Sequence, residues 1–126
     1  MGDSERQVVA VRGAVQAEAN TPEAIAAATE ALMGSLMDLN DLEPEAMISA
    51  IFTVTDDLDA EFPAVAARTM GLSDVPLICA REIPVPGSLE RVIRVMVHFN
   101  CDSGRPVRHA YLGETRNLRS DLEAAQ

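Results

Sequence analysis

The chain has 126 residues, of which 48% are hydrophobic and 24% charged, and this composition predicts one globular domain over residues 1–126 rather than a disordered chain. Its net charge is −10 at pH 7, with arginine as the only strongly basic residue type. Because an acidic surface repels phosphate groups, we expect neither nucleic acid nor an anionic membrane surface as a partner.

The first half of the chain predicts a strand, a helix and a second strand. Residues 7–15 form an apolar, β-branched run that indicates a buried strand. A helix follows, for which Thr21 is the N-cap candidate and Pro22 the first residue. The second strand is predicted over residues 47–54, before an acidic turn. Apolar residues at helical spacing predict the buried face of the helix, namely Ile25, Ala28, Leu32, Leu36 and Leu39.

The second half predicts a short helix and three strands. The helix spans residues 62–70, begins with Pro63 and ends before Gly71, with Arg68 in its last turn. Strands are expected over residues 75–83, 91–101 and 107–112. In the middle one of these, Ile93, Val95, Val97 and Phe99 alternate with the other residues and make one wholly apolar face.

This order of elements predicts an α+β fold, a mixed β-sheet with helices packed on one face. The other face of the sheet would stay uncovered in a single copy of the chain, which indicates an oligomer. Residues 1–7 and 120–126 are expected to be flexible tails. We find neither a signal-peptide-like stretch nor an apolar run of about 20 residues, so we expect a cytoplasmic protein.

The usual catalytic patterns are missing from the sequence. His98 and His109 fit no metal-ligand spacing, and Cys79 and Cys101 form no C-x-x-C pair, so we expect no metal. Cys79 lies in an apolar run, where cysteine is usually a small hydrophobic residue rather than a nucleophile. Isolated glycines provide no phosphate-binding loop.

Three predicted strands each carry a charge among apolar neighbours: Arg12, Glu82 and Arg94. A buried charge must be paired or must bind a ligand. One interpretation is an internal ion pair, and Arg81 and Arg91 nearby fit the same interpretation. The other is a ligand site, in which two guanidinium groups bind carboxylates and Glu82 accepts a proton from a hydroxyl. That site would suit a small dicarboxylate that carries an alcohol.

Seven segments, in order and spacing, resemble the small monofunctional chorismate mutases that form a homotrimeric pseudo-α/β-barrel. They are VRGA at 11–14, TPEAI at 21–25, FPAVAAR at 62–68, VPLICAREI at 75–83, IRVMV at 93–97, RHAYL at 108–112 and LRSDL at 118–122. The resemblance implies an isomerase that converts chorismate to prephenate in phenylalanine and tyrosine biosynthesis. It also implies active sites between subunits of a homotrimer and no cofactor.

The resemblance also implies roles for individual residues. Arg12 would bind a substrate carboxylate, Arg94 the ether oxygen and a carboxylate, and Glu82 the ring hydroxyl. The backbone near Cys79 would assist, and Tyr111 would bind a carboxylate. Arg68 and Arg119 would lie at the mouth of the pocket, whose walls would be formed by Phe62, Ala64, Leu77, Ile78 and Leu118.

One departure from the family pattern and two other functions remain open at this stage. Val65 follows the Phe-Pro-Ala segment where some relatives carry a basic residue, which puts the charge of the pocket mouth in doubt. Enamine/imine deaminases and small-carboxylate-binding proteins of a related trimeric fold also use an arginine to hold a carboxylate. A non-catalytic trimerisation module, with the charges as ion pairs, is the third interpretation.

Overall fold

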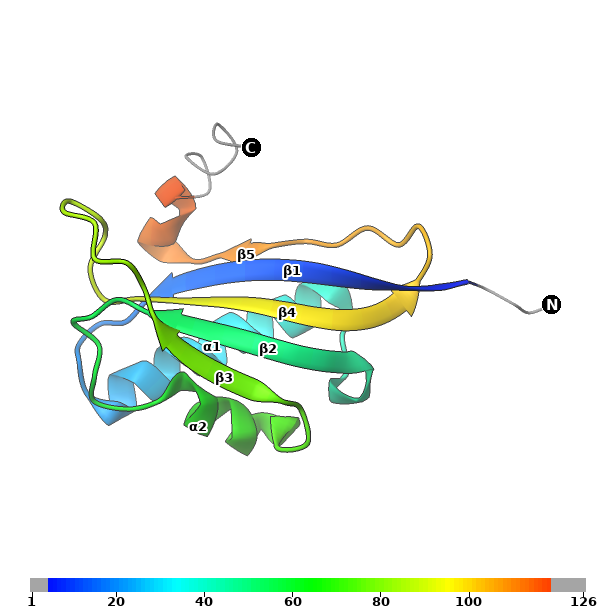
Figure 1. Cartoon of the computed structure of the whole chain (residues 1–126), viewed down its shortest axis with the longest axis horizontal. Helices are drawn as coiled ribbons and strands as arrows, with labels where there is room; N and C mark the ends of the chain where they lie inside the picture. The colour runs from blue at the N-terminus through cyan, green and yellow to red at the C-terminus, as the bar shows by residue number, and fades with distance from the viewer. Residues whose placement is uncertain (1–4, 119–126) are drawn as a thin grey trace.

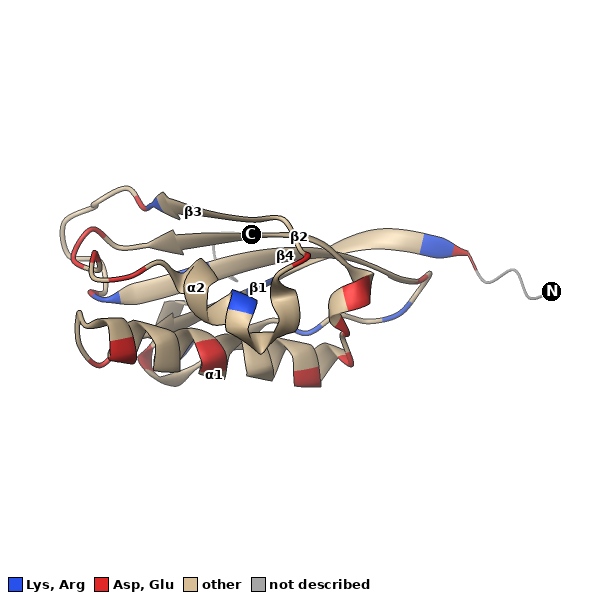
Figure 2. Ribbon diagram, turned by 90° about the horizontal axis from the view of Figure 1, so that it is seen from below, with Lys and Arg blue, Asp and Glu red and all other residues tan. Residues whose placement is uncertain are grey.

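The computed structural model describes residues 5–118, which form one five-stranded mixed sheet covered on one side by helices (Figures 1 and 2). The sheet order is β3-β2-β4-β1-β5. The predicted α+β class and the order of its elements are therefore confirmed. The elements are β1 (Arg6–Gln16), α1 (Pro22–Asn40), η1 (Pro44–Ala46), β2 (Met47–Val54), α2 (Pro63–Ala67), η2 (Arg68–Leu72), β3 (Leu77–Arg81), β4 (Val92–Asp102), β5 (Ala110–Tyr111) and η3 (Gly113–Thr115).

Strand β4 lies at the centre of the sheet and is antiparallel to both of its neighbours, β1 and β2. The outer strands β3 and β5 run parallel to β2 and β1, respectively. The register places Arg94 of β4 opposite both Ala14 of β1 and Thr53 of β2, whereas Arg12 lies opposite Met96. Because directly opposite residues share a face of the sheet, these side chains all belong to the same face.

Helix α1 begins as the sequence predicts. The Oγ1 atom of Thr21 accepts a hydrogen bond from the backbone N–H of Ala24 at 3.1 Å, and Pro22 is the first helical residue. The buried face of α1 differs from the predicted one, since Leu39, which was expected to be buried, is 44% exposed. Met33, which was not predicted, is fully buried. The prediction for Leu39 was therefore wrong. Helix α1 ends at Asp41, whose φ of 48° is left-handed.

The hydrophobic core lies between the helices and one face of the sheet. The predicted apolar face of β4 is confirmed, with Ile93, Val95, Val97 and Phe99 at most 3% exposed. The opposite face, called here the open face, is not covered by α1 or α2 (Figure 2). It presents several large apolar side chains to solvent in a single copy of the chain, among them Val8, Ile51, Ile78 and Met96.

Three predicted elements are shorter in the structure. The predicted strand 75–83 contracts to Leu77–Arg81, partly because Pro76 has no N–H to donate to a ladder. The predicted strand 107–112 retains only Ala110–Tyr111. Helix α2 itself ends at Ala67, but Arg68 keeps helical dihedral angles and the chain continues as the wider helical segment η2. Gly71, with a φ of 97°, interrupts this segment at the position where the sequence predicts the helix to stop.

The expected tails also differ. Residues 6 and 7 pair with Asp102 and Cys101 as part of β1, so they do not belong to a flexible tail. Residues 1–4 and the expected tail 120–126 lie outside the described part of the chain.

Two local features hold β5 in place. Asn40, 3% exposed at the end of α1, donates to the carbonyl of Arg108 at 2.9 Å and accepts from its N–H at 2.8 Å. Gly13 of β1 lies so close to β5 and α1 that an added Cβ would be 2.7 Å from the carbonyl oxygen of Ala110 and 2.8 Å from Leu32 Cδ1. The position therefore requires glycine for a close approach of backbone segments.

Candidate active site

The open face contains a hollow of about 230 Å³ over the middle of the sheet. Four neighbouring strands contribute its lining, and two of the three predicted site charges lie there, together with the predicted Tyr111. The lining residues are Arg12, Gly13, Ile51, Thr53, Arg94, Val95, Met96 and Tyr111.

The third predicted charge, Glu82, joins this group through direct contacts. Its Oε2 atom lies 2.9 Å from Nε of Arg94 and accepts a hydrogen bond from Oγ1 of Thr53 at 2.7 Å. The side chains of Glu82 and Arg94 are 16% and 35% exposed, so the pair is partly shielded from water in one copy of the chain. The internal ion pair that the sequence left open therefore exists, and it lies beside the hollow.

Arg12 and Tyr111 are placed by the pairing of β1 with β5. The backbone N–H of Arg12 donates to Nδ1 of His109 at 3.0 Å, which requires an unprotonated Nδ1. Two residues further along β1, Ala14 pairs with Tyr111. Tyr111 is 9% exposed and packs with Ala14 and Val92, and Leu118 lies against this small cluster.

The other predicted site residues lie elsewhere in the same chain. A second hollow, of about 350 Å³, is formed by α2, β3 and the loop after β2, and Phe62 and Cys79 line it. Phe62 is 65% exposed, whereas Ala64 is buried. Ile78 is 60% exposed on the open face.

Leu77 is half-buried against the core and Arg68 is exposed. Arg119 lies outside the described residues. A single copy of the chain thus brings Arg12, Arg94, Glu82 and Tyr111 to the first hollow, with Leu118 beside Tyr111. Phe62 and Cys79 line the second hollow instead, and these two residues together with Ala64 and Arg68 are called here the α2–β3 group.

Thr53, Ile51 and Met96 also line the hollow, and they were not predicted from the sequence. The alternation of strand residues could have assigned the first two to one face of β2. Their proximity to Arg94 depends on β2 lying beside β4, and the order of strands in the sheet is not visible in a single sequence.

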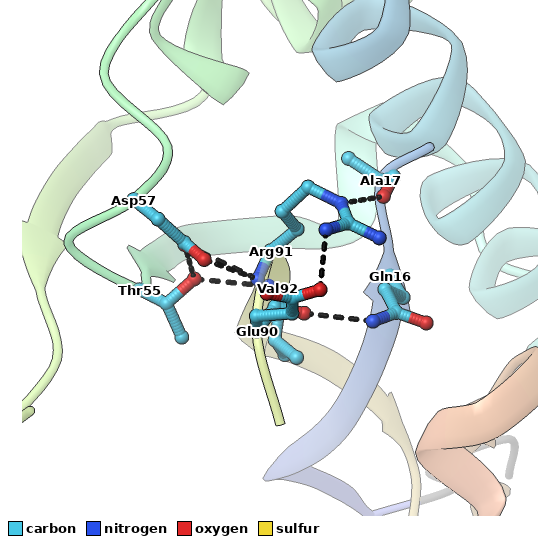
Figure 3. A network of polar contacts seen from close by, with 7 residues as sticks. All are labelled: Gln16, Ala17, Thr55, Asp57, Glu90, Arg91 and Val92. Carbon is cyan, nitrogen blue, oxygen red and sulfur yellow. Dashed lines mark hydrogen bonds and ion pairs between the residues drawn. The ribbon is translucent and has the colours of Figure 1, made fainter. Parts of the chain in front are cut away.

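Arg91, by contrast, has a structural role (Figure 3). Its φ of 52° is left-handed, and its backbone N–H donates to both carboxylate oxygens of Asp57, at 3.0 and 3.1 Å. Its side chain donates to the carbonyl of Ala17 at 3.0 Å and pairs with Glu90 at 2.6 Å. This network joins the loop after β2, the end of β1 and the start of β4, and so fixes the strand that carries Arg94.

Chemically, the hollow offers two guanidinium groups and a phenol, and the carboxylate of Glu82 lies beside it through its pair with Arg94. Within residues 5–118 we find neither a cluster of three side chains able to hold a metal ion nor a helix long and apolar enough to cross a membrane. The fold and the site define a small α+β protein that can bind a compact anion and place fixed positive charge against it.

Comparison with known proteins identifies the family. The family model for chorismate mutase type I matches residues 8–122. A chorismate mutase AroH from Thermus thermophilus is 51% identical over 118 residues, covering 92% of this chain and 97% of that protein. The AroH of Bacillus subtilis (strain 168) is 37% identical over 114 residues, covering 89% and 90%, respectively.

The structural comparison agrees with the sequence comparison. A chorismate mutase from Clostridium thermocellum superposes with a TM-score of 0.83 at 47% identity and covers 86% of this chain and 98% of its own. The chain belongs to the type I chorismate mutases and is an isomerase. The family match selects this function over the deaminase-like and non-catalytic interpretations of the sequence.

Proposed function

We propose that Arg94, Glu82 and Arg12 carry the conversion of chorismate to prephenate, an intramolecular Claisen rearrangement. One C–O bond of the substrate breaks while one C–C bond forms, so no proton transfer, nucleophile or cofactor is required. Partial negative charge develops on the ether oxygen as the C–O bond breaks. The observation that carries the proposal is the pairing of Arg94 with Glu82 beside a hollow that Arg12 also lines.

Arg94 supplies the positive charge for the ether oxygen. Its contact with Glu82 runs through Nε, and a guanidinium carries five N–H donors in all, so the group can hold Glu82 and a ligand together. A preorganised donor of this kind contributes about 3–4 kcal/mol to stabilisation of the transition state. Because the ion pair fixes the guanidinium before the substrate arrives, little reorganisation is needed during the reaction.

The remaining residues bind and orient the substrate. Arg12 binds one carboxylate of the substrate. Tyr111, on the neighbouring strand β5, donates a hydrogen bond to a carboxylate of the substrate. Glu82 accepts a hydrogen bond from the hydroxyl on the ring of the substrate. Holding the flexible enolpyruvyl side chain over the ring is an entropic contribution to the rate, separate from the electrostatic one.

We further place the site between subunits of a homotrimer. Two features support it: the apolar side chains that the open face exposes, and the separation of the α2–β3 group from Arg94 within one copy. A neighbouring copy that covers the open face would bury Ile51 and Met96 and bring its own Phe62, Ala64 and Arg68 towards the hollow. We also place the enzyme in the cytoplasm, where its free thiols, Cys79 and Cys101, would stay reduced.

Two measurements test the proposal. Purified protein should consume chorismate, followed by the loss of its absorbance, and prephenate should be the product. The mass in solution should be that of three chains, measured by sedimentation or light scattering. Absence of turnover would overturn the assigned chemistry, and an active monomer would overturn the shared site.

A further inference from the structure

Thr53 lies at the point where two of the three charged residues of the site, Glu82 and Arg94, meet. The register places it on β2 opposite Arg94 of β4 and next to Ala80 of β3. Its Oγ1 atom donates to Glu82 Oε2 at 2.7 Å. Glu82 Oε2 also lies 2.9 Å from Arg94 Nε. The backbone of Glu82 is held to the same strand, because its N–H donates to the carbonyl of Val54 at 2.9 Å.

We infer that Thr53 is a positioning residue, whose hydroxyl fixes the side chain of Glu82 and, through it, the guanidinium of Arg94. This inference rests on the proposed function. A glutamate side chain has three rotatable bonds, and its carboxylate would otherwise exchange between rotamers. Hydrogen bonds to a charged acceptor are stronger than neutral ones, so one hydroxyl can select a single rotamer.

The two contacts also assign different tasks to the two carboxylate oxygens of Glu82. Both Thr53 and Arg94 contact Oε2. Oε1 makes neither of these contacts, so it is the oxygen left to accept a hydrogen bond from the hydroxyl of the ligand.

The hydroxyl, rather than the shape of the side chain, is what this role requires. Valine has nearly the shape of threonine and is at least as favourable in a strand. Thr53→Val should consequently fold, while it removes the donor to Glu82. Serine keeps the hydroxyl and loses only a methyl group, so Thr53→Ser is the matched control.

The experiment measures kcat and KM for chorismate in the full-length chain and both variants, with thermal unfolding of each. Loss of a hydrogen bond to a charged group predicts a fall in kcat/KM of roughly 10- to 100-fold for Thr53→Val. Most of the loss should appear in kcat, because Arg94 acts on charge that develops in the transition state. Thr53→Ser should stay within about threefold of the unsubstituted enzyme, on the same hydrogen-bond reasoning.

A double-mutant cycle with Glu82→Ala tests whether Thr53 acts through Glu82. In the Glu82→Ala background, Thr53→Val should cause no further loss of kcat. Full activity of Thr53→Val, equal loss in both Thr53 variants, or the full Thr53→Val loss in the Glu82→Ala background would each overturn the inference and leave the proposed function intact. Absence of turnover in the unsubstituted chain would overturn the proposed function, and the role of Thr53 with it.

Discussion

Replacing Gly13 with alanine should damage both the stability and the activity of the protein, although the change adds one methyl group. The new Cβ would lie 2.7 Å from the carbonyl oxygen of Ala110, about 0.7 Å inside the 3.4 Å at which ordinary contact begins. The first obstacle is backbone, and the second, Leu32 Cδ1 at 2.8 Å, is fully buried, so neither can move without displacing its neighbours.

Overpacking of this kind costs about 2–3 kcal/mol, and for a chain of this length that lowers Tm by roughly 6–15 °C. Activity should fall as well, because β1 carries Arg12 and β5 carries Tyr111, and the added methyl group would push the two strands apart. A misplacement of about 1 Å can cost up to ~100-fold in rate.

The matched control is Gly34→Ala. Gly34 lies within α1 and an added Cβ there meets nothing within 4 Å. Alanine should therefore stabilise the helix by about 0.5–1 kcal/mol and leave kcat/KM unchanged. Thermal unfolding followed by circular dichroism, with turnover of chorismate, checks both variants. Equal Tm and equal kcat/KM for Gly13→Ala and the unsubstituted chain would refute the close approach of β1 and β5.

Three further predictions concern a buried amide, the charge of Glu82 and the effect of pH. Asn40→Ala removes hydrogen bonds to both backbone groups of Arg108 and should lower the free energy of unfolding by about 2–3 kcal/mol, measured by denaturant titration; a change below about 0.5 kcal/mol would contradict this role. Glu82→Gln should keep part of its activity, because an amide oxygen still accepts a hydroxyl, and complete recovery of kcat would show that the charge is irrelevant. The kcat for chorismate should be nearly constant from about pH 6 to 9, since no proton transfer limits the step; a bell-shaped profile would instead indicate a titrating residue such as His98, His109 or Cys79.

The fold was largely predictable because its elements carry strong local signals. Thr21 and Pro22 mark the start of α1, and alternating apolar residues mark the buried face of β4. The errors arise where packing overrides local pattern. Leu39 continues the apolar stripe of α1 but is 44% exposed, and in the same last turn the polar side chain of Asn40 is buried instead, whereas Met33 is fully buried.

The site was predictable only in part. Arg12, Glu82 and Arg94 stand out because each is a charge within or directly after an apolar strand, and a buried charge there without a partner would be costly. Thr53 carries no such signal, since threonine is common in strands. Its contact with Glu82 exists because β2 lies between β3 and β4, an arrangement set by packing of the whole sheet.

The central claim is that a fixed positive charge on Arg94 stabilises the breaking ether bond, and the steady-state kinetics of Arg94→Ala test it most directly. We expect kcat for chorismate to fall by at least ~10²–10³ while KM changes far less. Arg94→Lys keeps a positive charge without the planar fork and should recover only part of the loss. A near-normal kcat in Arg94→Ala, with the protein folded, would contradict the account.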